Sequence, residues 1–136
     1  MSQIHDNEIL SYTVDFKKKK IIFLTKYTSK TLNENTTIEF LNVTIHLFEN
    51  AIEGSIILDI TKCSIKDFIT NNKELLEKKK NYCWPMFYDT ESELTQKLND
   101  KKQSYFVISS ALGLCGWILA EDMKIIVKNE ATEIAK

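Results

Sequence analysis

The 136-residue sequence predicts an α+β fold: a mostly antiparallel sheet of about six strands, with two helices packed on one face. Two observations predict this fold. Segments in the first half of the chain alternate apolar and polar residues, which is typical of antiparallel strands with one buried face, and β-prone segments return near its end. Between them, residues 64–98 carry apolar side chains at helical spacing. We therefore expect both helices to be inserted between the fourth and fifth strands.

The first half of the chain predicts four strands. Apolar and polar residues alternate over residues 10–16, and four lysines at 17–20 link this strand to a second one at 21–27. The short connection favours a hairpin between these two strands. A long β-prone stretch at 36–50 predicts the third strand, and a fourth follows the Glu53–Gly54 turn.

The third predicted strand changes its pattern part-way. Its apolar residues are even-numbered at Ile38 and Phe40 but odd-numbered from Leu41 onwards. Because successive side chains of a strand point to opposite faces, a regular strand cannot bury both sets on one side. We therefore predict a β-bulge or bend near Leu41–Asn42.

Two capping patterns mark the helices. Ser64 is followed by Asp67 three positions later, and Thr90 by Glu93, so that each side chain can bond the backbone N–H of the other residue. The first helix is expected to run to the lysines at 78–80, and the second is shorter. Two further strands, SYFVISSA and CGWILAEDMKIIVK, follow around a turn that contains glycine.

The composition limits the classes of function. All 18 basic residues are lysines and 19 acids oppose them, so a net charge of −1 does not favour binding to polyanions or to a membrane surface. Without arginine, the chain lacks the planar guanidinium fork that reads bases and clamps phosphates. Cys63, Cys83 and Cys115 are odd in number and widely spaced, which favours free thiols over a disulfide scaffold or a zinc site.

The length fits a single domain, residues 1–136, in which we expect flexible termini at 1–8 and 129–136. The N-terminal MSQIHDNEIL is polar and contains acids, unlike a signal peptide, and no apolar run has the length of a membrane span. Together with free thiols, this pattern favours a cytoplasmic protein.

A histidine close to carboxylates is the first candidate for chemistry. His46 lies in TIHLFENAIEGSIILDI, with Glu49 three positions on and Asp59 further along, and such a group could serve a small enzyme as a general base. Residues three apart on a regular strand point to opposite faces, so His46 and Glu49 would meet only across a bulge. Asp59 would have to reach across a hairpin. We favour a strand histidine without a catalytic role, and we predict no catalytic residue and no enzyme.

No pattern predicts a cofactor or a metal site. The three glycines cannot form a phosphate-binding loop, and DTESE at 89–93 lacks the spacing of a calcium loop. The lysines at 17–20 and 78–80, with Phe16 and Trp84 nearby, could attract nucleic acid in a regulatory module. We favour a solvated hairpin tip and a helix end stabilised by the helix dipole, with the aromatic rings in the core.

The connector between the two predicted helices, NYCWPMFYD, is the most unusual stretch. Large amphipathic rings followed by acids are typical of protein–protein contacts, although a loop that covers one end of the core would also use such rings. The candidate partner-binding residues of this stretch and of the helix start after it are Tyr82, Trp84, Phe87, Tyr88, Asp89, Glu91 and Glu93.

Four segments, SYTVDFKKKKIIFLTKY, HLFENAIEGSIILDI, LLEKKKNYCWP and VISSALGLCGWILAEDM, lie within roughly residues 8–126. Together they resemble a family of small, uncharacterised bacterial single-domain proteins, which look like the immunity proteins encoded beside secreted or contact-delivered toxins. The resemblance implies a non-catalytic protein that binds and neutralises a cognate bacterial toxin domain. It implies a protein partner, rather than a membrane or a nucleic acid, and carries over no site residue.

Overall fold

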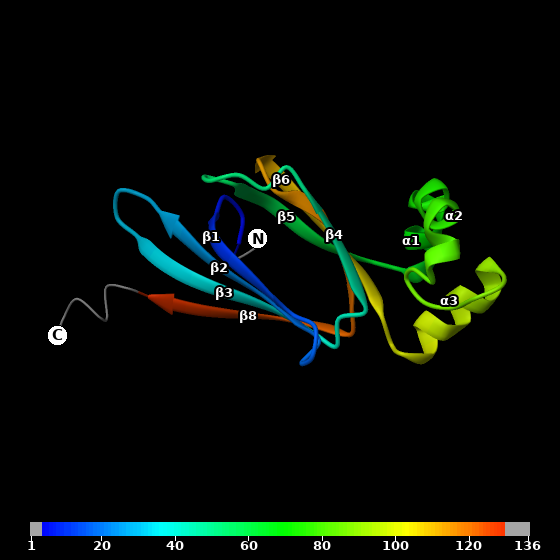
Figure 1. Cartoon of the computed structure of the whole chain (residues 1–136). Helices are drawn as coiled ribbons and strands as arrows, with labels where there is room; N and C mark the ends of the chain where they lie inside the picture. Colours follow the sequence, from blue (N-terminus) through cyan, green and yellow to red (C-terminus); the bar gives the residue numbers. More distant parts are fainter. Residues whose placement is uncertain (1–3, 130–136) are drawn as a thin grey trace.

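The computed structural model describes residues 4–129, which form an eight-stranded sheet and a group of helices at one end of it (Figure 1). The sheet order is β4-β7-β6-β5-β1-β2-β3-β8, and all of its pairings are antiparallel. The predicted α+β class is confirmed. In chain order the elements are β1 (Glu8–Asp15), β2 (Lys20–Thr28), β3 (Asn33–Leu41), β4 (Ile45–Glu49), β5 (Ile56–Cys63), α1 (Ile65–Asn71), α2 (Lys73–Lys79), the 3₁₀ turn η1 (Lys80–Tyr82), α3 (Glu91–Asp100), β6 (Ser104–Leu112), β7 (Cys115–Ala120) and β8 (Asp122–Asn129).

Two of the six predicted strands are each divided by a bend, which is why the sheet has eight strands rather than six. β3 and β4 are the halves of the third predicted strand, and β7 and β8 are the halves of the last one. The bends face each other, with the three residues 42–44 opposite residues 120 and 121. The β3–β4 side thus has one extra residue, as in a β-bulge, and the bulge or bend predicted near Leu41–Asn42 is confirmed.

Hydrogen bonds hold the two bends together. The Glu121 N–H donates to the Leu41 carbonyl at 2.9 Å, and the Thr44 N–H donates to the Leu119 carbonyl at 2.8 Å. The side-chain amide of Asn42 donates to Glu121 Oε1 at 2.7 Å. Because both long strands turn at the same level, the sheet folds over, and the half made of β1, β2, β3 and β8 faces the half made of β4, β7, β6 and β5.

The space between the two halves is the first core. Its buried rings include Phe23 and Phe40 from one half and Phe106 from the other, and the Phe40 and Phe106 rings meet edge to face at a centroid distance of 5.5 Å. Such contacts add attraction between the rings to the hydrophobic gain from burying them. One pair of residues, Glu8 and Ile56, joins β1 to β5, so the fold is partly open on that side.

The outer face of β6 and β7 carries a second core beneath the helices. Trp117 and Leu119 point to the helices, whereas Ile118 and Ala120 of the same strand point to the first core. Phe68 of α1 packs on Trp117 with a ring-centroid distance of 5.0 Å. The helices thus pack on one face of the sheet and lie between β5 and β6 in the chain, which are the fourth and fifth predicted strands.

The helical segment contains three α-helices rather than the two predicted. Ser64 and Thr90 cap α1 and α3, with the full reciprocal pair of bonds at Ser64 and Asp67 only, because the Glu93 side chain accepts from the Asp89 N–H instead of the Thr90 N–H. The first predicted helix is interrupted at Asn72. The Asn72 side-chain amide donates to the Phe68 carbonyl at 2.9 Å and lies 3.3 Å from the Tyr105 hydroxyl. An asparagine side chain that bonds a backbone carbonyl four residues earlier competes with the helix, which explains the break.

The beginning of the described chain packs against the sheet from Ile4 onwards, and the expectation of a flexible segment at residues 1–8 stays a prediction. Ile4 is 1% exposed and belongs to the first core. The side-chain amide of Asn7 is buried and donates to Thr25 Oγ1 at 3.0 Å. An apolar anchor and a satisfied buried amide therefore fix this segment, although its composition is that of a polar terminus.

The other terminal expectation falls almost entirely outside the described residues. Of residues 129–136, the structure describes Asn129, the last residue of β8. Residues 1–3 of the N-terminal expectation also lie outside the described residues. Within residues 4–129, no helix combines the length and the apolar character that crossing a membrane would require.

Candidate functional site

The position of His46 on β4 determines which groups its ring can reach. β4 pairs with β7 without irregularity from Ile45 to Glu49, so His46 and Glu49 point to opposite faces of the sheet. Asp59 lies on β5, and two strands, β6 and β7, separate β5 from β4. β4 and β5 therefore do not form the hairpin that would have brought Asp59 near, and the structure places neither carboxylate beside the imidazole.

The His46 ring lies in apolar surroundings. Its centroid is 4.8 Å from that of Phe48, and it makes no hydrogen bond or ion pair with the described residues. Partial burial lowers the pKa of His46 below its usual value of 6.5, so the ring is neutral at neutral pH. An imidazole without a partner to fix its tautomer contributes to an apolar surface rather than to a pair that transfers protons.

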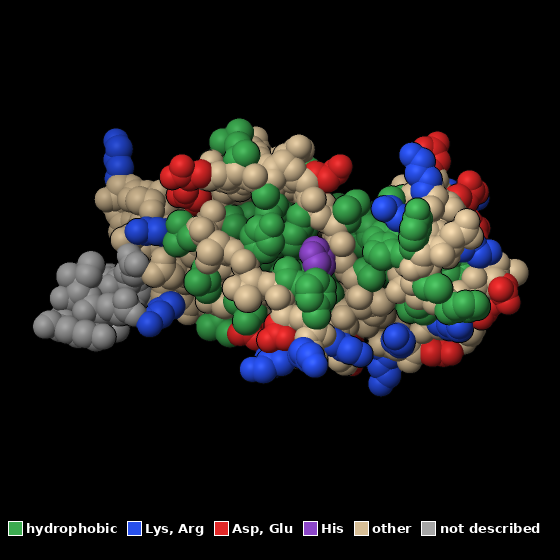
Figure 2. All heavy atoms as spheres, in the orientation of Figure 1, with side chains coloured by type: hydrophobic (Ala, Val, Ile, Leu, Met, Phe, Trp, Pro, Cys, Tyr) green, Lys and Arg blue, Asp and Glu red, His purple; other side chains and the backbone are tan. Residues whose placement is uncertain are grey.

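A groove passes His46 between the β1–β2 turn and the helical connector. Figure 2 shows hydrophobic side chains gathered around β4 on this face, with lysines along the edge where the β1–β2 turn lies. The groove has a volume of about 330 Å³ and a mainly apolar lining. We call it the aromatic groove, and we define it by Val14, Phe16, Ile45, His46 and Trp84.

Phe16 is exposed at the rim of this groove. The sequence had indicated a core position for its ring, so that expectation is wrong for Phe16. β1 ends one residue earlier, at Asp15, where the carboxylate accepts a hydrogen bond of 2.9 Å from the Lys18 N–H and closes the turn. Its side chain is 82% exposed, and Leu10 and Tyr12, which alternate with it along β1, are exposed as well. A large ring in water on a short, bonded turn is a feature of binding surfaces.

The aromatic residues of the connector divide into a buried and an exposed set. Tyr88 is 7% exposed and Trp84 is half-buried; both pack in the second core, where the Trp84 and Trp117 ring centroids are 6.1 Å apart. Tyr82 and Phe87, in contrast, are 78% and 72% exposed. The cover over the core that the sequence left open therefore describes Trp84 and Tyr88, and a partner surface stays a prediction for Tyr82 and Phe87.

Hydrogen bonds to lysines and to the start of α3 fix the connector. Lys80 Nζ donates to the Asp89 carbonyl at 2.5 Å, and Lys97 Nζ donates to the Phe87 carbonyl at 2.7 Å. The Asp89 N–H donates to Glu93 Oε1 at 2.9 Å, and Glu93 also forms an ion pair of 3.1 Å with Lys97. The Asp89 N–H first, and then Lys97, lower the pKa of Glu93. A fixed loop loses less entropy when a partner binds the rings that it carries.

The acidic candidates likewise divide by what they contact. Glu93 is used within the connector, as described above. The exposed carboxylates of Asp89 and Glu91 form no salt bridge with other described residues. We define the connector patch as Tyr82, Phe87, Asp89 and Glu91, the exposed members of the predicted set. The patch therefore combines exposed rings with carboxylates that form no salt bridge to the described residues.

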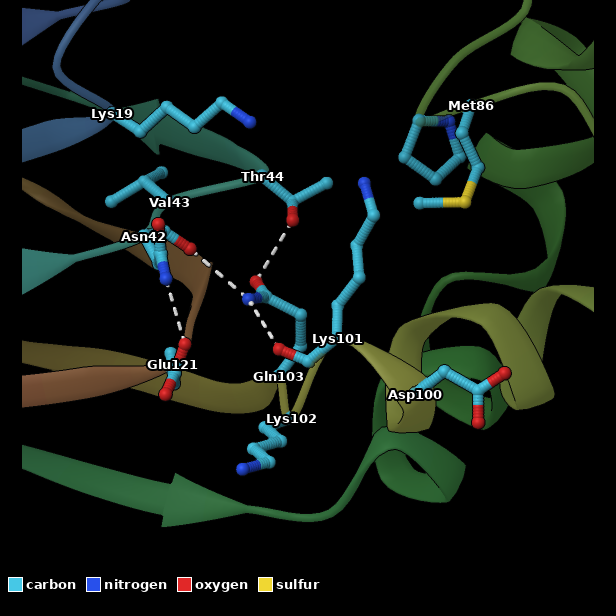
Figure 3. Close-up of a pocket in the computed structure, with 11 residues that line it drawn as sticks. Lys19, Asn42, Val43, Thr44, Met86, Asp100, Lys101, Lys102, Gln103 and Glu121 are labelled. Carbon is cyan, nitrogen blue, oxygen red and sulfur yellow. Dashed lines mark hydrogen bonds between the residues drawn. The ribbon is translucent and has the colours of Figure 1, made fainter.

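A second pocket lies beside the β3–β4 bend and shares Lys19, Val43 and Thr44 with the aromatic groove. Its floor is Gln103, whose Nε2 donates to the Asn42 carbonyl at 3.0 Å and whose Oε1 accepts from Thr44 Oγ1 at 2.9 Å (Figure 3). Met86 forms part of the opposite wall (Figure 3). We call it the Gln103 pocket. The sequence did not reveal it, because a glutamine after a helix gives no sign that it will be buried.

The geometry of the chain itself is the basis for interpreting its function. No protein-family model, curated protein or solved structure matches the chain. Among residues 4–129, no three histidine, cysteine, aspartate or glutamate side chains gather in a way that could hold a metal ion.

Proposed function

We propose that this protein is a non-catalytic binding module that neutralises a bacterial toxin domain by direct contact, as an immunity protein does in the cytoplasm. The observation that carries the proposal is the exposure of Phe16, Tyr82 and Phe87 on turns and loops with a fixed backbone. Side chains of this size are usually buried, and aromatic residues dominate the binding energy of many protein interfaces.

The shape of the surface suits a protein rather than a small substrate. The aromatic groove lies between elements that are far apart in sequence, and Trp84 connects it to the connector that also carries Phe87. A standard protein interface buries about 800 Å² on each partner and concentrates its energy in a few central rings. Phe16 and Phe87 are suited to that role, and the lysines of the β1–β2 turn are suited to a polar rim.

Neutralisation by contact requires no reaction from this chain. A module that covers the active site of a toxin needs affinity and a fixed surface, and the hydrogen bonds of the connector supply the second. The sequence resemblance to immunity-type proteins supports a toxin domain as the partner. The unpaired carboxylates of the connector patch favour a toxin surface with cationic side chains opposite them.

The test begins with purification of the tagged protein from its native host. We expect a stoichiometric protein partner whose toxic activity is abolished by an equimolar amount of this protein. Phe87→Ala should weaken the complex by about ten-fold or more, because it removes an exposed ring held by the Lys97 bond to its backbone. Leu24→Ala, at an exposed apolar position on β2, is the control and should leave the affinity unchanged.

Two results would contradict the proposal. One is the recovery of no stoichiometric partner from cells that express the protein at its natural level. The other is a partner whose activity is unaffected by the purified protein, or whose affinity is the same for the Phe87→Ala variant and the wild type. Circular dichroism of each variant shows whether the fold is intact, so a loss of affinity is not confused with unfolding.

A further inference from the structure

The Gln103 pocket carries an uncompensated positive charge. Three lysines and two acids line it, which leaves one net positive charge. Asp100 points away from the cavity, and the Glu121 carboxylate, which accepts a hydrogen bond from Asn42, keeps its negative charge and offsets one of the three lysines (Figure 3). The charged lining residues are Lys19, Lys101, Lys102, Asp100 and Glu121.

Two of the lysines extend into the pocket from opposite sides. Lys19 comes from the β1–β2 turn and Lys101 from the residue that ends α3, whereas Lys102 points away (Figure 3). Neither the Lys19 nor the Lys101 ammonium group forms a hydrogen bond or an ion pair with the part of the chain that the structure describes. Two unpaired cations across one cavity attract an anion between them.

The lining favours a carboxylate among the possible anions. Each ammonium group can bind one carboxylate oxygen, and the single net positive charge of the lining matches a monoanion. A phosphate monoester carries about −1.5 to −2 charges at neutral pH and would meet the Glu121 carboxylate of the same lining. Pro85 and Met86 provide an apolar wall against which the aliphatic stem of an acidic side chain can pack.

We propose that the Gln103 pocket binds the carboxylate of an aspartate or glutamate of the protein partner, held between Lys19 and Lys101. This inference rests on the proposed function and specifies one of the contacts it requires. The pocket shares Lys19, Val43 and Thr44 with the aromatic groove. A partner segment that places an apolar side chain close to an acidic one therefore fills both.

The first test uses the isolated protein and acetate as the probe. Titration of the ¹⁵N-labelled protein with acetate, inorganic phosphate or chloride at equal ionic strength is followed through the Gln103 side-chain amide. Acetate should produce a saturable shift at lower concentrations than phosphate or chloride. Lys101→Gln should weaken acetate binding by about five-fold, and the neighbouring Lys102→Gln is the matched control that should leave it unchanged.

The second test uses the purified complex. Lys101→Gln should weaken partner binding by about five-fold and reduce its dependence on salt, whereas Lys102→Gln should change neither. An unchanged affinity of the Lys101→Gln variant, with acetate binding intact in the isolated wild type, would overturn the assignment of the carboxylate to the partner.

The other outcomes separate the pocket from the proposed function. A linear acetate response, or equal effects of Lys101→Gln and Lys102→Gln, would overturn the site itself. Tighter binding of phosphate than of acetate would overturn the carboxylate as its ligand. Failure to find any partner would overturn both the proposed function and the partner carboxylate, while a saturable acetate response would still establish a carboxylate site.

Discussion

Replacing Gly116 by alanine tests how β4 is seated on β7, and therefore how the His46 side of the aromatic groove is built. Gly116 pairs with Phe48 of β4 and has a φ of +149°. A Cβ atom at this position would lie far inside van der Waals contact of the Leu47 carbonyl oxygen and 3.0 Å from Phe48 Cα. Both are backbone atoms, so no side-chain rotation can relieve the clash.

Two terms set the magnitude of the expected effect. Forcing extra atoms into a well-packed site typically costs about 1–3 kcal/mol. A positive φ at a residue with a Cβ costs about 1 kcal/mol or more. We therefore expect Gly116→Ala to lower the free energy of unfolding by about 3 kcal/mol, which corresponds to a fall of about 10 °C in Tm for a chain of this length.

Gly54→Ala is the matched control for this substitution. Gly54 also has a positive φ, +84°, but an added Cβ would meet no atom within 4 Å. It should therefore show the backbone strain alone, about 1 kcal/mol. Urea unfolding followed by tryptophan fluorescence measures both variants. A loss for Gly116→Ala no larger than that for Gly54→Ala would refute the close seating of β4 on β7.

Two further predictions concern the stability of the fold. Ser64→Ala removes the N-cap of α1 and should cost about 1 kcal/mol in urea unfolding. Ser92→Ala, at an exposed position of α3, should change stability by less than about 0.5 kcal/mol, and equal losses would contradict the cap. Burial lowers the pKa of His46, so the unfolded chain binds a proton at this residue more readily than the folded chain does. The contribution of the neutral ring to the free energy of unfolding is therefore present above about pH 6.5 and is lost as the pH falls below that value. Between about pH 7.5 and about pH 5.5 the wild type should therefore lose more stability than His46→Gln, and equal losses would show that the ring is not buried.

Features set by neighbouring residues were predictable from the sequence. The change of parity between Phe40 and Leu41 predicted the bend, because the alternation of faces depends on the local backbone alone. The caps Ser64 and Thr90 were predictable for the same reason. The helix break at Asn72 was harder to predict, because the side-chain bond that causes it forms to a carbonyl of the helix itself.

Features that depend on distant contacts were not predictable. In a regular strand Ile56, Leu58 and Ile60 would share one buried face. In the structure Ile57 is buried and Leu58 is exposed, because the pairing of β5 with β6 is irregular at Ile57. The separation of His46 from Asp59 by two strands, and the burial of Gln103 at the β3–β4 bend, also depend on topology.

The most direct test of the proposed function is the affinity of the purified partner for a Phe16→Ser/Phe87→Ser double variant, measured by titration calorimetry. The matched control is Leu24→Ser, which changes an exposed apolar residue outside the groove and the connector patch. We predict a one-to-one complex that the double variant weakens by about a hundred-fold or more and that the control leaves unchanged. An affinity of the folded double variant equal to that of the wild type would contradict the account.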